Sequence, residues 1–122
     1  MKPDPCQLLR ACLKEAGSLI AEANRKKKNI QYKGRFNLVT ETDKKSERLI
    51  LRKIRRAFPD HSILAEESGA SSHHSDSPRR LVKPRWIIDP LDGTTNFAHG
   101  FPMFCVTIGY EENGRMKAGG VY

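Results

Sequence analysis

The chain has 122 residues, of which 38% are apolar, and its formal net charge is +8. This length suits one domain with a modest core and excludes two independent domains. No run of about 18 apolar residues occurs and the N-terminal residues lack a secretory apolar stretch, so we expect a soluble, cytoplasmic protein without a membrane partner. Its three cysteines lack metal-ligand spacing and fit free thiols in a reducing compartment.

The first predicted element is a long helix near the N-terminus. Asp4 followed by Pro5 is typical of a helix start, because aspartate caps free N–H groups and proline fits the first helical position. Apolar residues between Leu9 and Ala23 then recur at helical spacing. The pattern predicts a helix over about 5–27.

A second helix is predicted after an irregular stretch. Residues 29–43 contain Gly34 and short β-favouring pieces. A new apolar face then recurs at helical spacing until Pro59, which cannot continue a helix. We therefore expect the second helix over about 42–57.

The second half of the chain is predicted to form short strands. The Ser-rich segment 68–80 has no apolar period and is expected to be a surface loop. A short helix is expected to begin near Thr94, and Asn113-Gly114 predicts a hairpin between the last two strands. The expected strands cover residues 62–67, 85–89, 104–110 and 115–122.

Basic residues are concentrated in the first half of the chain. Residues 1–59 carry 16 Lys and Arg against 6 Asp and Glu, whereas residues 60–122 carry 6 against 8. Much of the excess lies in residues 24–29 and 51–58, where it could strengthen binding to nucleic acid. Solvated helix ends and faces explain the same charges without a partner.

The segment WIIDPLDGTTNF, residues 86–97, gathers polar residues where a buried strand is expected to stop at a proline. Asp89 and Asp92 flank this proline, so their carboxylates can converge on one point together with the Leu91 carbonyl. Ligands that are all oxygen suit Mg²⁺. A plain Asp-Pro turn whose carboxylates cap the backbone is the alternative interpretation.

The residues after this turn favour a phosphate site. Gly93 permits a close backbone approach, and the N–H groups of Gly93, Thr94 and Thr95 open the expected short helix. A metal and a phosphate would then lie side by side. His99 follows this helix, and either a substrate-facing role or a structural loop role fits its position.

Three separated segments resemble the inositol monophosphatase family of Mg²⁺-dependent phosphatases: NLVTETDKKSE (37–47), LAEES (64–68) and the segment 86–97. The resemblance implies an α/β chain with the α+β layered sugar-phosphatase fold, in which two long helices pack on a mostly antiparallel sheet. Family members are considerably longer, and a later segment supplies a further metal-binding aspartate. Residues 1–122 are therefore expected to be the N-terminal part of such a domain, incomplete at the C-terminus.

The resemblance also implies a role for each site residue. It selects Glu66 rather than Glu67 as a metal ligand. The implied metal ligands are Glu66, Asp89, the Leu91 carbonyl and Asp92. The implied substrate-binding residues are Glu66, Leu91, Asp92, Gly93 and Thr94. The implied catalytic residues are Asp43, Glu66 and Thr94, with Asp43 and Thr94 orienting the attacking water.

The implied reaction is the Mg²⁺-dependent hydrolysis of a phosphate monoester. Metal ions would activate the water and neutralise charge on the leaving oxygen, without a covalent phosphoenzyme. Residues 94–102, TTNFAHGFP, are similar to the branch that acts on inositol monophosphates. The resemblance further implies inhibition by lithium and a homodimer at full length. A basic module that contacts RNA or the transcription machinery is the alternative function, and activity of the 122 residues alone is left open.

Overall fold

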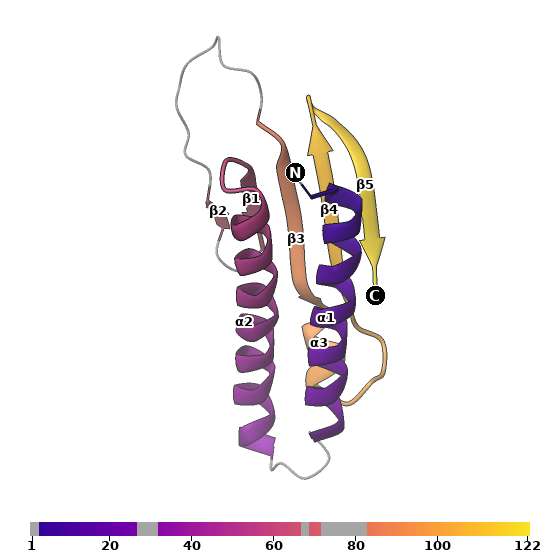
Figure 1. Cartoon of the computed structure of the whole chain (residues 1–122). Coiled ribbons are helices and arrows are strands. Elements are labelled where there is room, and N and C mark those ends of the chain that lie inside the picture. Colours follow the sequence, from indigo (N-terminus) through magenta and orange to yellow (C-terminus); the bar gives the residue numbers. More distant parts are fainter. Residues whose placement is uncertain (1–2, 27–31, 67–68, 72–82) are drawn as a thin grey trace.

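The computed structural model describes residues 3–26, 32–66, 69–71 and 83–122. Two long helices lie side by side on one face of a five-stranded sheet (Figure 1). The helices are α1 (Pro5–Lys26), α2 (Tyr32–Ala57) and the short α3 (Thr94–Ala98). The strands are β1 (Ser62–Ala65), β2 (Gly69–Ser71), β3 (Arg85–Asp92), β4 (Cys105–Glu112) and β5 (Arg115–Val121).

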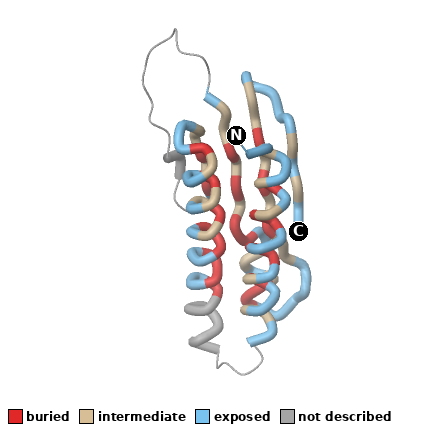
Figure 2. Tube along the Cα trace, viewed as in Figure 1, coloured by how far each residue is buried: buried red, intermediate tan, exposed pale blue. Residues whose placement is uncertain are grey.

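Helix α1 confirms the first predicted helix. The Asp4 side chain accepts a hydrogen bond from the backbone N–H of Cys6, at 3.0 Å, as expected of a capping residue. One stripe of the helix is buried against the sheet (Figure 2), and it consists of Leu9, Cys12, Leu13, Ala16, Gly17 and Ile20. All three cysteines are free, in agreement with the sequence-based expectation.

Helix α2 begins ten residues earlier than the predicted start at residue 42. The expectation of β-favouring pieces in this stretch is wrong from Tyr32 onward. The missed stretch contains Gly34, Phe36 and Val39, whose modest helix propensity favoured irregular or β structure. The buried face of the helix also carries polar side chains between the apolar residues Val39 and Ile50. These buried polar residues, Thr42, Asp43, Ser46 and Glu47, keep helical spacing but hide it from an apolar pattern.

The strand order is β2-β1-β3-β4-β5. Only β1 and β3 pair in parallel, and the other neighbouring strands pair antiparallel. The fold therefore confirms two long helices on a mostly antiparallel sheet. Because β1 and β3 are parallel, their C-terminal ends lie at the same edge of the sheet. Glu66, just after β1, donates its backbone N–H to the Ile88 carbonyl of β3 at 3.2 Å.

Strand β3 differs from its prediction because it continues past Pro90 to Asp92. Its pairing with β4 shifts between Asp89 and Asp92, which marks a bulge. Proline has no N–H to donate to a ladder, so a bulge is the place where a strand accommodates it. The segment 85–92 is thus one strand with an irregular end.

The remaining elements follow the predictions closely. Helix α3 begins at Thr94, and positive φ angles at Asn113 and Gly114 give the expected tight hairpin between β4 and β5. Part of the expected loop 68–80 is strand β2, whereas Glu67 and residues 72–82 lie outside the described residues.

The main core lies between the helices and the sheet, and its largest fully buried side chains include Trp86, Phe97, Ile50 and Ile54. The sheet also carries an apolar groove of about 780 Å³, lined by residues that include Leu64, Ile87, Met116 and Val121. Across the described ranges, no helix combines the length and apolar character needed to cross a bilayer.

Candidate active site

Three segments meet at the edge where β1 and β3 both end: the residue after β1, the bulge of β3, and the start of α3. They surround a cavity of about 200 Å³, which we call the strand-end cavity. Its lining consists of Glu66, Asp89, Leu91, Asp92, Gly93, Thr94, Thr95 and Asn96. Every residue that the sequence assigned to metal or phosphate is in this lining, and Thr95 and Asn96 join them.

Asp89 is the most perturbed carboxyl group of this cavity. Burial, a hydrogen bond with Glu66, and the charges of Glu66 and Asp92 together raise the pKa of Asp89 from 3.8 to about 7. Its Oδ1 atom is buried and has no hydrogen-bond partner among the described residues. Three carboxyl groups therefore share a small space in which negative charge is poorly compensated.

A hard divalent cation fits this donor set. Carboxylate and carbonyl oxygens are the ligands that Mg²⁺ prefers, and this ion usually keeps several waters while binding through one or two carboxylates. Within the part of the chain that the structure describes, no group of three or more His, Cys, Asp or Glu side chains is arranged to hold a metal ion by itself. The orphaned Oδ1 of Asp89 and its two acidic neighbours thus fit an open Mg²⁺ site rather than an enclosed one.

Gly93 connects the bulge to α3 in a left-handed conformation, with φ 84°. A Cβ atom at this position would lie 2.8 Å from the Met103 carbonyl oxygen, so only glycine fits without a shift of the backbone. No side chain of a described residue caps the N-terminus of α3, and the Gly93 carbonyl accepts the first helical hydrogen bond, from the backbone N–H of Phe97. The N–H groups at the start of α3 are therefore not used by a capping side chain.

Asp43 lies on α2 and is buried, at 6% exposure. It is not among the described residues that line the strand-end cavity. Its helix nevertheless contacts the strand that carries the site, because the Ser46 hydroxyl donates a hydrogen bond of 2.7 Å to the Pro90 carbonyl. Sequence reasoning missed Ser46, and its only signal was a small polar residue on the buried face of a helix.

Three further contacts surround the cavity. The Asn96 amide donates a hydrogen bond to the Met103 carbonyl at 2.9 Å and fixes the loop after α3. The Cys105 sulfur lies 3.9 Å from an Asp92 carboxylate oxygen. His99 is exposed, and its Nδ1 lies 2.8 Å from the Thr95 carbonyl, which favours the structural loop role.

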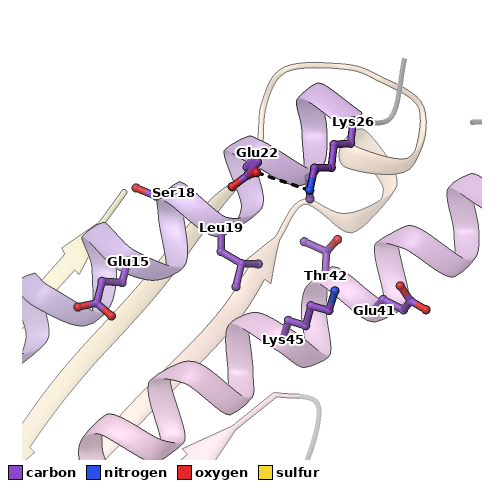
Figure 3. Close-up of a pocket in the computed structure, with 9 residues that line it drawn as sticks. Glu15, Ser18, Leu19, Glu22, Lys26, Glu41, Thr42 and Lys45 are labelled. Atoms are coloured by element: carbon purple, nitrogen blue, oxygen red, sulfur yellow. Dashed lines mark ion pairs between the residues drawn. The ribbon is translucent and has the colours of Figure 1, made fainter. Parts of the chain in front are cut away.

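A second cavity, of about 410 Å³, lies between α1 and α2 (Figure 3), and we call it the interhelical cavity. It is lined by Glu15, Ser18, Leu19, Glu22, Ala23, Lys26, Glu41, Thr42 and Lys45. Three acidic and two basic side chains lie in this lining, and Lys26 pairs with Glu22 at 3.5 Å. No residue assigned to metal or phosphate lies in its described lining.

Two long helices on one face of a mostly antiparallel sheet, with a cavity lined by carboxyl, carbonyl and hydroxyl groups where the parallel strand pair ends, define a layered α/β protein. The chain belongs to the inositol monophosphatase family, which matches residues 6–122. This membership confirms the resemblance seen in the sequence.

Individual relatives agree with the family. The chain is 45% identical to inositol monophosphatase 2 of Solanum lycopersicum over 109 residues, which cover 89% of this chain and 40% of that protein. An inositol monophosphatase structure from Anabaena matches with a TM-score of 0.73 and 39% identity, over 96% of this chain and 38% of that one. The extragenic suppressor protein SuhB from Bartonella henselae matches with a TM-score of 0.76 and 32% identity, over 95% and 42%. The chain thus spans about 40% of the length of the curated relative.

Proposed function

We propose that the protein is a Mg²⁺-dependent phosphomonoester hydrolase that converts myo-inositol monophosphate and water to inositol and phosphate. The observation that supports this proposal best is the strand-end cavity. There, burial and the neighbouring carboxyl groups of Glu66 and Asp92, which crowd Asp89, raise the pKa of Asp89 to about 7. Such crowding destabilises the metal-free site, and a bound cation relieves it. Its proposed ligands are Glu66, Asp89, the Leu91 carbonyl and Asp92.

The phosphate group of the substrate is proposed to lie beside these carboxylates, at the start of α3. Gly93 and Thr94 lie in the lining of the strand-end cavity, and the left-handed Gly93 has no side chain to keep a phosphate away. Mg²⁺, when bound, supplies positive charge that stabilises the transferring phosphoryl group and makes water more acidic. The residues of the chain orient the substrate, because they hold its phosphate group beside the carboxylates of the cavity.

Asp43 and Thr94 are proposed to orient the attacking water. Asp43 lies on α2 and Thr94 at the first position of α3, and these two helices contact each other. A carboxylate that accepts a hydrogen bond from a water molecule aligns the lone pair of that water for in-line attack on phosphorus. Water is then the nucleophile, and none of these residues forms a covalent intermediate.

The experiment that tests this proposal is a phosphate-release assay with myo-inositol 1-phosphate, in a Mg²⁺ titration. We expect activity that depends on Mg²⁺, falls in lithium, and exceeds the activity on fructose bisphosphate and on nucleotide 3′-phosphates. Mg²⁺ binding is measured in parallel by calorimetry, which separates a loss of the metal site from a loss of turnover. Hydrolysis that is unaffected by a chelator would contradict the proposal.

A second candidate function is a basic module that contacts RNA or the transcription machinery. The observation in its favour is the excess of basic residues in positions 1–59, 16 against 6 acidic. Basic pairs end both long helices, with Arg25 and Lys26 in α1 and Arg55 and Arg56 in α2. At these positions the basic side chains also interact favourably with the helix dipole, so their placement does not require a binding partner. A salt titration of RNA binding tests the module, since true phosphate contacts give a steep salt dependence.

A further inference from the structure

We propose that Ser46 is a positioning residue of the strand-end cavity: its hydroxyl holds the bulge of β3 against α2 and thereby sets the orientation of the metal ligands. The part of this inference that concerns metal binding rests on the proposed function. The part that concerns the position of the bulge rests on the geometry alone. Ser46 touches neither the lining of the cavity nor a reacting group. It acts through the Pro90 carbonyl, to which it donates a hydrogen bond of 2.7 Å.

The bulge leaves Pro90 without support from the sheet. In the register of β3 with β4, Asp89 pairs with Thr107 and Asp92 with Cys105, and the two residues between them are skipped. The register of β3 with β1 ends at Ile88. Pro90 is fully buried, so its carbonyl cannot turn to water for a partner. The Ser46 hydroxyl supplies the hydrogen bond that the ladders do not.

The position of Ser46 on α2 favours this hydrogen bond to the Pro90 carbonyl. Ser46 is 0% exposed in the middle of α2, where a serine commonly bonds back to a carbonyl of its own helix. Here it reaches a residue 44 positions away instead. The bond therefore fixes the distance between α2, which carries Asp43 one turn earlier, and the strand that carries Asp89 and Asp92. The Ser46 hydroxyl thus links α2 and β3, which carry the two parts of the proposed active site.

Loss of this hydrogen bond affects the residues on either side of Pro90. Asp89 precedes it and Leu91 follows it, and both line the strand-end cavity. Without a partner, the buried Pro90 carbonyl gains by rotating toward any available donor, and this rotation moves the carboxylate and the carbonyl on either side. Outer contacts that orient metal ligands commonly change metal affinity by about 10-fold to 100-fold.

The test compares Ser46→Ala with Ser46→Thr and with a matched control, Ser62→Ala. Threonine keeps the hydroxyl. Ser62 is also a serine that donates to a proline carbonyl, that of Pro84, but at the opposite end of β3 and at 3.5 Å. The Pro84 carbonyl keeps a second bond, from the Ser62 backbone N–H at 3.0 Å, when this hydroxyl is removed. The control therefore repeats the chemical change without leaving an orphaned carbonyl.

Two readouts are measured on each variant: backbone hydrogen exchange of residues 89–94 without metal, and the Mg²⁺ dissociation constant by calorimetry. We expect Ser46→Ala to speed exchange in this segment and to raise the dissociation constant about tenfold, with Ser46→Thr close to wild type and Ser62→Ala unchanged. Wild-type protein that fails to bind Mg²⁺ would count against the proposed function, while the exchange data still judge the position of the bulge. Exchange and affinity that are equal in Ser46→Ala and wild type would overturn the inference.

Discussion

The interhelical and strand-end cavities differ in both size and charge. The interhelical cavity measures about 410 Å³ and the strand-end cavity about 200 Å³. In the larger one, charges of both signs lie together, and Lys26 pairs with Glu22. The described lining of the smaller one contains three carboxyl groups and no lysine or arginine. The larger cavity is therefore close to electrical balance, and the smaller one is not.

From this difference we infer that uncompensated charge, rather than volume, singles out the candidate site. A surface groove with balanced side chains gains little from a ligand, because each group already has a partner or water. The strand-end cavity holds Asp89 at a raised pKa and leaves its Oδ1 atom without a partner among the described residues. Perturbed pKa values of this kind are more frequent at functional sites than elsewhere in proteins.

The largest expected effect comes from removing charge in the strand-end cavity. If the proposed function holds, Asp89→Asn and Asp92→Asn should each abolish Mg²⁺-dependent phosphate release, because an amide would replace a proposed anionic ligand while the side chain keeps its shape. Far-ultraviolet circular dichroism should show an intact fold, and calorimetry should show lost Mg²⁺ binding.

Glu22→Gln, the same change in the interhelical cavity, is the matched control. It also exchanges a carboxylate for an amide, but at a residue with a lysine partner. Turnover should stay at the wild-type level. Near-normal turnover at saturating Mg²⁺ in both aspartate variants would remove the distinction between the two cavities.

A smaller loss of activity is expected from the residues assigned to the water. Asp43→Ala and Thr94→Ala should lower kcat by about 10²-fold or more, and raise KM less, since alignment of the water acts mainly in the transition state. Steady-state kinetics at several Mg²⁺ concentrations separate the two constants. If both substitutions raise KM alone, the two residues bind substrate and do not orient water.

These assignments also show what the sequence could and could not predict. The cluster from Asp89 to Thr94 was predictable because its members are neighbours, and proline and glycine fix the local turn. Helix α2 was predicted too short because its first ten residues include Gly34 and β-favouring residues, whose local preference the assembled fold overrides. The bond between Ser46 and Pro90 joins residues 44 positions apart, so no local pattern contains it. Sequence patterns capture local geometry, whereas contacts between distant segments depend on the assembled fold.

The raised pKa of Asp89 predicts a pH effect of moderate size. Its folded pKa is about 7 and its ordinary value is 3.8, so between these values the folded chain keeps a proton that the unfolded chain loses. Metal-free stability should therefore fall as pH rises from about 4 to about 7 and then level off. Mg²⁺ binding requires the ionised carboxylate, so Mg²⁺ affinity should fall as pH drops below about 7.

Thermal unfolding in a chelator, repeated with Asp89→Asn, measures this effect. The variant cannot ionise at this position, so its stability should lack the part of the pH dependence that Asp89 causes. It should also be more stable than wild type above about pH 7 without metal, because it relieves the repulsion with Glu66 and Asp92. Parallel pH curves for the two proteins would show that Asp89 has an ordinary pKa.

The smallest effect is expected from Glu22→Gln on stability. Glu22 and Lys26 are four residues apart on α1, with side chains 62% and 70% exposed, so water screens their attraction strongly. Such helical pairs contribute about 0.2–0.5 kcal/mol. Glu22 also lies near the C-terminal end of the helix, where a negative charge is unfavourable, and this offsets part of the loss. Urea unfolding should show that the free energy of unfolding decreases by less than about 0.5 kcal/mol, and this decrease should disappear in high salt.

The sign of the change in stability is the decisive point. Loss of a carboxylate should slightly destabilise the chain in the interhelical cavity, whereas it should stabilise the metal-free chain in the strand-end cavity. The same sign in both places would mean that the carboxylates of the strand-end cavity are as well compensated as those on the helices.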